Sequence, residues 1–197
     1  MKEIIKKIKV YRYGELEGDA RARAFDFLKE WYEDCLGSVF VDGMESAVKE
    51  LGLEVEGYDL EEYGGYVNIF YGKYDEDLNE IDSARAYAFI QNNFFSRVNK
   101  RKYIRDGHYT HLPDKNWMDN CELTGYYTDG AIKDAWEEFV KELRKGNNPS
   151  VSDFIGYLED AFVKMYQEEM QGYDEECAEE DTECNDFWFT EDGKGVS

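Results

Sequence analysis

The two histidines of the chain stand close together, as His108 and His111 in an H-x-x-H spacing, with Cys121 downstream. Imidazole nitrogen and thiolate sulfur are good zinc ligands, and a structural zinc site takes four ligands. The sequence has no C-x-x-C pair, and the position of Cys121 fits no common zinc signature. These residues are therefore weak metal candidates. Two histidines on a polar surface loop are the simpler interpretation, and we expect no cofactor.

The segment around the histidines supports an alternative, enzymatic function. Asp106 and Asp114 could join His108 and His111 in a metal-dependent nuclease, or in an enzyme that modifies RNA or nucleotides. The sequence contains no G-x-S-x-G, P-loop, H-E-x-x-H or G-x-G-x-x-G motif. We therefore predict a protein without catalytic activity and keep the enzyme as the alternative.

The four cysteines are spread along the chain, and the last two, Cys177 and Cys184, are separated by six residues in an acidic segment. They could bind a metal or form a disulfide, but unpaired thiols in a solvated segment are the favoured interpretation. The sequence shows no signal peptide and no apolar run that could cross a membrane. We expect a reduced protein in the cytoplasm of a bacterial host cell.

One basic segment precedes the histidines, with Tyr103 and Tyr109 among its cations. Cations interleaved with aromatic rings can bind single-stranded nucleic acid. Cations at the end of a helix also complement the helix dipole, and an acidic chain repels phosphate, so direct contact with nucleic acid is the weaker interpretation. The residues that could make such contacts are Arg97, Lys100, Arg101, Lys102 and Arg105.

The opposite charge dominates near the end of the chain, where ten of the nineteen residues from 168 to 186 are acidic and none is basic. A solvated charge run and a metal-binding segment are two interpretations. The third is phosphate mimicry. Carboxylates three or four positions apart on a helix lie about 5–6 Å from one another, so one helical stripe is sparser than duplex DNA, with about one charge per 1.7 Å of axis, and stripes from several elements would have to combine. The residues predicted to bind a protein partner are Glu168, Glu169, Asp174, Glu175, Glu176, Glu179, Glu180, Asp181 and Glu183.

The whole chain of 197 residues carries 45 acidic and 23 basic residues, a net charge of −22. Such a charge repels nucleic acid and attracts proteins whose grooves normally hold DNA or RNA. An acidic proteome of the host explains the same charge without any partner. Aromatic residues make up 16% of the chain, which argues against disorder.

The spacing of apolar residues predicts the elements that carry these side chains. We expect an α+β fold, in which a small antiparallel sheet of about four strands packs with about five helices. Residues 1–197 would form one compact domain, and the alternative is two lobes, 1–104 and 125–197, joined by an irregular loop. The predicted elements are strand 5–13, helix 18–36 ended by Gly37, helix 42–51, strands 53–60 and 64–74, helix 81–102, helix 129–145, a helix from Ser150 and a closing strand 187–190.

Both ends of the chain resemble a widespread group of small phage- and plasmid-encoded proteins. The opening "VYRYGELEGDARARAFDFLKEWYEDC" is similar to their strand, aromatic-x-E-L turn and alanine-rich helix. The ending "ECNDFWFTEDG" is similar to their E-x-N-E-Y-x-F-T-E-D-G, with Cys184 where relatives tend to have alanine. The matching residues are Tyr13, Glu15, Leu16, Ala20, Ala24, Trp31, Tyr32, Asn185, Phe187, Phe189, Thr190, Glu191, Asp192 and Gly193.

The resemblance implies an origin in a mobile element and supplies no catalytic residues. By analogy with acidic phage proteins that oppose host defence, we expect an anti-CRISPR or other anti-defence inhibitor. It would bind a host nuclease, such as a type II-A Cas9-like effector, and block nucleic-acid binding or cleavage. A phage scaffold or replication accessory protein is a further alternative, with a homodimer through exposed aromatic residues.

Overall fold

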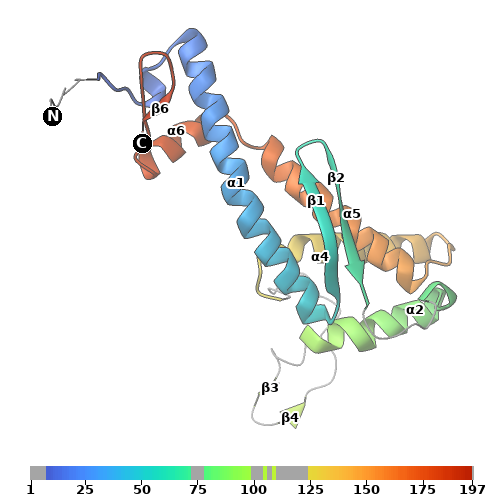
Figure 1. Ribbon diagram of the computed structural model, residues 1–197. Coiled ribbons are helices and arrows are strands. Elements are labelled where there is room, and N and C mark those ends of the chain that lie inside the picture. Colours follow the sequence, from blue (N-terminus) through green and yellow to red (C-terminus); the bar gives the residue numbers. More distant parts are fainter. Residues whose placement is uncertain (1–7, 72–77, 99–103, 106–107, 110–123, 197) are drawn as a thin grey trace. The chain divides into compact units, whose positions relative to one another are not determined.

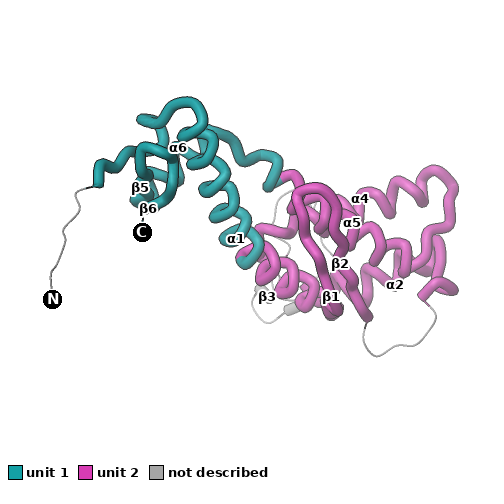
Figure 2. The backbone as a smooth tube through the Cα atoms, turned by 45° about the horizontal axis from the view of Figure 1, so that its top comes forward, with its two compact units in different colours: residues 1–38, 169–197 teal, residues 39–168 magenta. Residues whose placement is uncertain are grey.

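The computed structural model describes residues 8–71, 78–98, 104–105, 108–109 and 124–196 (Figure 1). Two compact units make up the chain, and Figure 2 shows them in different colours. The terminal unit consists of residues 1–38 together with residues 169–197, and the central unit consists of residues 39–168. These bounds are not those of the lobes 1–104 and 125–197 that the sequence suggests, because the terminal unit brings together both ends of the chain.

The longest element, α1 (Gly18–Leu51), is one helix of 34 residues, so the prediction of two helices separated at Gly37 is wrong. The space beside Gly37 is open, and its backbone is not in the left-handed region. A glycine inside a helix costs only about 0.5–1 kcal/mol relative to alanine. Leu28 and Phe40, which stand on either side of Gly37, are fully buried. The burial of residues on both sides of Gly37 therefore outweighs the cost of the glycine, and the helix continues without a break.

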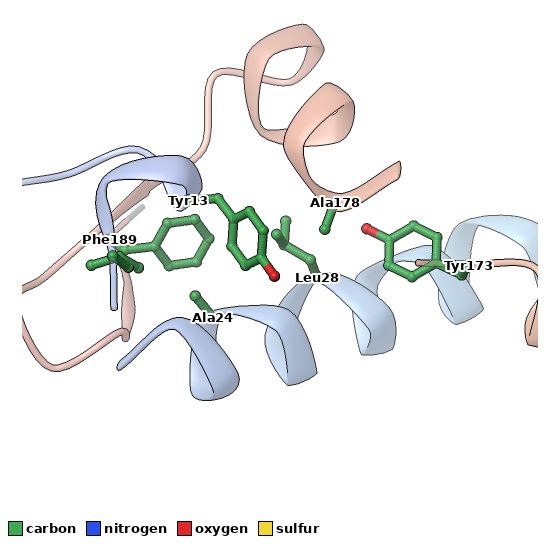
Figure 3. Packing of buried hydrophobic residues seen from close by; sticks show 7 residues of the cluster. Tyr13, Ala24, Leu28, Tyr173, Ala178 and Phe189 are labelled. Atoms are coloured by element: carbon green, nitrogen blue, oxygen red, sulfur yellow. The ribbon is translucent and has the colours of Figure 1, made fainter. Parts of the chain in front are cut away.

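In the terminal unit, the chain reaches α1 through a 3-10 turn, η1 (Tyr13–Glu15). The predicted N-terminal strand is wrong for the residues that the structure describes, where only Tyr11 pairs. The N–H groups of Tyr11 and Phe189 each donate to the other residue's carbonyl oxygen, at 2.8 and 2.9 Å. Tyr13, Leu28 and Phe189 are fully buried, and Figure 3 shows them packed with Ala24. The turn at Tyr13 ends the strand pairing because it directs this ring into the core.

The predicted closing strand is confirmed as β5 (Trp188–Phe189), which pairs antiparallel with β6 (Gly195–Val196). The ring of Phe187 makes edge-on contacts with the rings of Phe27 and Trp31 on α1, with centroids 5.9 and 5.1 Å apart. Such aromatic pairs contribute about 0.5–1.5 kcal/mol beyond their buried area. These contacts anchor the segment around Phe187 to α1.

In the central unit, β1 (Glu54–Glu61) and β2 (Gly64–Phe70) form an antiparallel hairpin, as the sequence predicts. Gly65 has a φ of +97°, and a Cβ atom there would collide with the carbonyl oxygen of Asp59 on β1. Only glycine at position 65 allows the start of β2 to approach β1 this closely.

The helix predicted over residues 81–102 is α2 (Ser83–Ile90) in the described part of the chain, continued by a π-helical stretch, η3 (Gln91–Phe95). Phe94 and Phe95, neighbours in this stretch, are both fully buried. The ring of Phe95 lies edge-on to Trp136, with centroids 5.1 Å apart. The wider π-helical turn thus accommodates two consecutive phenylalanines in one core.

Two further helices, α4 (Asp129–Arg144) and α5 (Val151–Gln171), begin where the sequence predicts. The capping pattern at the start of α5 is confirmed. The N–H of Asp153 donates to Ser150 Oγ at 3.1 Å, and the N–H of Ser150 donates to Asp153 Oδ2 at 2.6 Å. This reciprocal pair satisfies donors that the first turn of a helix leaves without a partner.

The α+β class is confirmed, but the prediction of one four-stranded sheet is wrong. The described strands form three separate antiparallel pairs: β1 with β2, β3 (Ile104–Arg105) with β4 (His108–Tyr109), and β5 with β6. An alternating pattern identifies a strand, but which strands become neighbours depends on packing between distant parts of the chain.

The outer edge of β2 is bonded to polar side chains of α5. Glu159 Oε1 accepts the N–H of Ile69 at 2.6 Å, and Gln167 Nε2 donates to the carbonyl oxygen of Gly64 at 2.7 Å. Burial raises the pKa of the Glu159 carboxyl, against the lowering effect of the bond from Ile69. These bonds occupy backbone groups at a strand edge, which can otherwise pair with other chains.

Glu159→Leu is expected to lower the free energy of unfolding by about 1–3 kcal/mol, because the N–H of Ile69 loses its acceptor. Glu159→Gln keeps an acceptor oxygen and removes a half-buried charge, so we expect no loss at neutral pH. Because its folded pKa is raised, the Glu159 carboxyl favours the folded state below its unfolded pKa and loses this contribution as the pH rises through the folded pKa. Urea unfolding of both variants at acidic and neutral pH measures these effects. Equal destabilisation by glutamine and leucine would contradict the assigned hydrogen bond.

Candidate protein-binding surface

The acidic segment folds as a helix, α6 (Glu175–Cys184), in the terminal unit. Asp174 caps it, because its Oδ1 accepts the N–H groups of Glu176 and Cys177 at 2.9 and 3.0 Å. The bond from the Cys177 N–H is the main reason why the pKa of Asp174 lies below its ordinary value. An acidic cap also suits the positive end of the helix dipole. Asp174 thus uses one carboxylate oxygen, Oδ1, to cap the start of α6.

One side of α6 faces the core of the terminal unit, where Ala178 and Thr182 are buried. Figure 3 shows Ala178 close to the Leu28 and Tyr173 side chains. The Tyr173 hydroxyl donates to Asp181 Oδ2 at 3.1 Å. Burial raises the pKa of Tyr173, and the Asp181 charge acts in the same direction. Asp181 therefore accepts a hydrogen bond within the terminal unit.

The opposite side of α6 carries four exposed carboxylates at positions i, i+3, i+4 and i+7. We call this set the acidic face; its members are Glu176, Glu179, Glu180 and Glu183. Neighbours at this spacing lie about 5–6 Å apart on a helix. Within the described part of the chain, no cation pairs with any of the four.

Two other predicted contact residues already have cationic partners. Glu175 pairs with Arg21 at 2.9 Å in the terminal unit, and Glu168 lies 3.5 Å from Lys164 in the central unit. Glu169 is exposed and belongs to the terminal unit, but it stands on α5. Of the nine predicted residues, the structure therefore brings four together as one stripe on a single helix.

The acidic face destabilises the helix that presents it. Like charges at i,i+4 cost an isolated helix about 0.2–0.5 kcal/mol per pair. In the last turn, Glu183 also stands at the negative end of the helix dipole, where cations are favoured, whereas the dipole favours Glu176 in the first turn. Natural proteins keep such locally unfavourable residues mainly at functional sites. The like charges of the acidic face therefore suggest a functional role.

Arg12 bonds the carbonyl oxygen of Thr182 near the end of α6, a role that is not predicted from the sequence. Its Nη1 donates to the carbonyl oxygens of Thr182 and Phe187, both at 3.0 Å, and its Nη2 bonds Asp186 at 2.5 Å. The guanidinium also lies over the ring of Trp188, 3.7 Å from its centroid. All these partners lie at least 170 positions away in sequence. No local pattern around residue 12 could have indicated this role.

Cys177 and Cys184 both lie on α6, seven positions apart. A rise of 1.5 Å per residue places their Cα atoms about 10 Å apart, beyond the roughly 7 Å that a disulfide can bridge. The two thiols therefore cannot pair with each other while α6 is intact. Among the residues that the structure describes, no three metal-ligating side chains gather into a candidate metal site.

The candidates of the basic and histidine segment fall mostly outside the described residues. Arg97 is exposed, and its Nε donates to the carbonyl oxygen of Asn93 at 2.9 Å. Arg105 and His108 are described only by their backbones, in β3 and β4. The candidates that lie outside are Lys100, Arg101, Lys102, Asp106, His111, Asp114 and Cys121.

No helix in the described ranges has the length and apolar character needed to span a membrane. Comparison with known proteins finds no matching family model, no matching curated protein and no matching solved structure. The resemblance to phage- and plasmid-encoded proteins stays a prediction from the sequence.

Proposed function

We propose that the protein is a non-enzymatic inhibitor that binds the nucleic-acid groove of a host defence nuclease through the acidic face of α6. The observation that carries the proposal is the stripe of Glu176, Glu179, Glu180 and Glu183, exposed and unpaired within the described residues, on a helix that it destabilises. Carboxylates accept charge-assisted hydrogen bonds from arginine and lysine, as phosphate oxygens do.

The helix is held in one place, which favours a specific surface over a loose charged tail. Asp174 caps its start, and Arg12 bonds the carbonyl oxygen of Thr182 near its end. Side chains presented by a fixed helix lose less conformational freedom on binding than the same residues in a disordered segment. The acidic face is therefore organised before any partner arrives.

The class of partner is inferred from charge and from the sequence resemblance. A net charge of −22 repels nucleic acid and favours a basic protein surface. The resemblance implies an origin in a mobile element, and the anti-defence role follows by analogy with acidic phage proteins that oppose host defence. A Cas9-like effector of type II-A is the partner that we propose, because its basic channel holds the guide–target duplex.

The test measures competition with DNA. A guide-loaded Cas9 of type II-A is incubated with a labelled target duplex, and the protein is added at increasing concentration. We expect release of the duplex, and direct binding that weakens steeply between low and high salt because the contacts are ionic. Affinity that is unchanged by salt, or full DNA binding in the presence of saturating protein, would contradict this proposal.

A further inference from the structure

The outer face of the β1–β2 hairpin in the central unit exposes two aromatic rings. Along β2, Val67 and Ile69 point inward and are only 3% and 8% exposed, whereas Tyr66 and Phe70 point outward and are 51% and 48% exposed. The solvated face of an antiparallel sheet is ordinarily polar. Two large rings on this face therefore call for a reason other than the core of the unit.

Each outward ring stands directly opposite a carboxylate on β1. Asp59 pairs with Tyr66, and Glu54 pairs with Phe70. The Cβ atoms of such cross-strand pairs lie about 4.5–5.5 Å apart. Among the described residues, no ring stacks on either aromatic side chain and no cation pairs with either carboxylate. The face thus presents two pairs of a ring and a carboxylate, and the register of β1 shifts between them, at Val55 to Gly57.

Between the two pairs, β1 has a glycine and therefore no side chain on this face. Gly57 of β1 stands opposite Asn68 of β2, and the space where its Cβ atom would project is open. The backbone of a ligand can approach a sheet closely at such a glycine. Asn68, which is exposed, offers both a donor and an acceptor at this position.

The hairpin is fixed before any ligand binds. The bonds of Glu159 and Gln167 from α5 hold the far edge of β2, and the inward residues Val67 and Ile69 anchor the strand in the core. A surface that is already ordered loses little conformational entropy on association. The outer face can therefore act as a binding site and not only as a solvated sheet.

The charge of this face determines which occupant it fits. A second copy of this chain would bring another −22 charge toward Glu54 and Asp59, and nucleic acid would bring phosphates. A cation can interact with both members of each pair, because it can lie over the aromatic ring and bond the carboxylate. Arginine fits better than lysine, because its planar guanidinium stacks on rings and bonds carboxylates with two N–H groups.

We propose that the outer face of the hairpin binds an extended protein segment with two arginines four residues apart. Tyr66 and Phe70 are four residues apart on β2, which spans about 13–14 Å at the rise of a strand. Two arginines at positions i and i+4 of an extended segment project on the same side at the same spacing. The segment's backbone then crosses Gly57 between the two pairs. This site lies in the central unit and does not rest on the function proposed for α6.

The probe for the test is the peptide acetyl-TRTVTRT-amide, with binding measured by calorimetry at low salt. We expect binding by the full-length protein, and about tenfold weaker binding by the Tyr66→Ala/Phe70→Ala variant, from two cation–π contacts worth about 0.5–1 kcal/mol each. The Glu54→Gln/Asp59→Asn variant should lose a similar factor. Glu137→Gln/Asp134→Asn, exposed on α4, removes the same charge elsewhere and should bind as the unaltered protein does.

Gly57→Val separates binding from folding. The open space and the β-branched side chain favour the strand, so this variant should unfold at the same or higher urea concentration while losing the peptide. A peptide with its arginines three positions apart should bind weakly, because one arginine then faces away. Equal binding of both peptides, an equal loss in the α4 control, or a dimer that the Tyr66→Ala/Phe70→Ala change dissociates would overturn the proposal. Loss of the peptide site with normal DNA competition would leave the function proposed for α6 intact.

Discussion

Exchanging Glu179 and Glu180 for lysine is expected to weaken binding to the nuclease by about a hundredfold or more, since each charged hydrogen bond contributes about 1.5–3 kcal/mol. Reversal adds repulsion against the basic groove to the lost bonds. The same change should leave α6 at least as stable as before. Glu175 and Glu176 stand four positions before the new lysines, which is the favourable order for a helical ion pair. Loss of binding without loss of helix therefore distinguishes a binding surface from a structural one.

The control for this variant changes the same total charge in the central unit. Asp134 and Glu137 are both exposed on α4, and replacing both with lysine alters the net charge as the α6 reversal does. We expect this control to weaken binding only by the small, salt-sensitive amount that follows from overall charge. Circular dichroism and urea unfolding check the fold of both variants, and titration against the nuclease measures affinity. Equal effects of the two variants would show that the total charge, and not the acidic face, governs binding.

Replacing Arg12 with alanine is expected to destabilise the terminal unit by about 2–3 kcal/mol, since bonds from charged donors contribute about 1.5–3 kcal/mol each and this side chain is partly solvated. The change removes the guanidinium bonds to the carbonyl oxygens of Thr182 and Phe187, although Thr182 still accepts the N–H of Phe187 at 3.1 Å. It also removes the cation from the ring of Trp188. Because the acidic face already strains α6, we expect the helix to open first.

Amide hydrogen exchange is the measurement for Arg12, because it reports the opening of each segment separately. Exchange in α6 and β5 should accelerate by about thirtyfold or more, as 2–3 kcal/mol implies, while exchange in α4 stays unchanged. Arg23→Ala provides a matched control in the same unit. The Arg23 side chain also bonds a carbonyl group, because its Nε donates to the carbonyl oxygen of Asp192 at 2.7 Å. An Arg12→Ala variant with normal exchange in α6 would show that the cap at Asp174 suffices.

Local features of the fold could be predicted from the sequence with useful accuracy. The bounds of α4, the start of α5, the capping pair of Ser150 and Asp153, and the closing strand at Phe189 follow from residues within a few positions of one another. The break expected at Gly37 shows the limit of that approach, because buried residues on both sides outweigh the preference of one glycine.

The sequence alone determined the net charge, the concentration of carboxylates near the end of the chain and the amphipathic helices, since these depend only on composition and spacing. Only the tertiary structure decided which carboxylates remain free for a partner. Glu175 pairs with Arg21, 154 positions away in sequence, whereas no cation of the described residues pairs with the acidic face. The same holds for Arg12 and for the pairs of rings and carboxylates on the hairpin. Their roles come from contacts between residues distant in sequence, or from strand register, and a local pattern specifies neither.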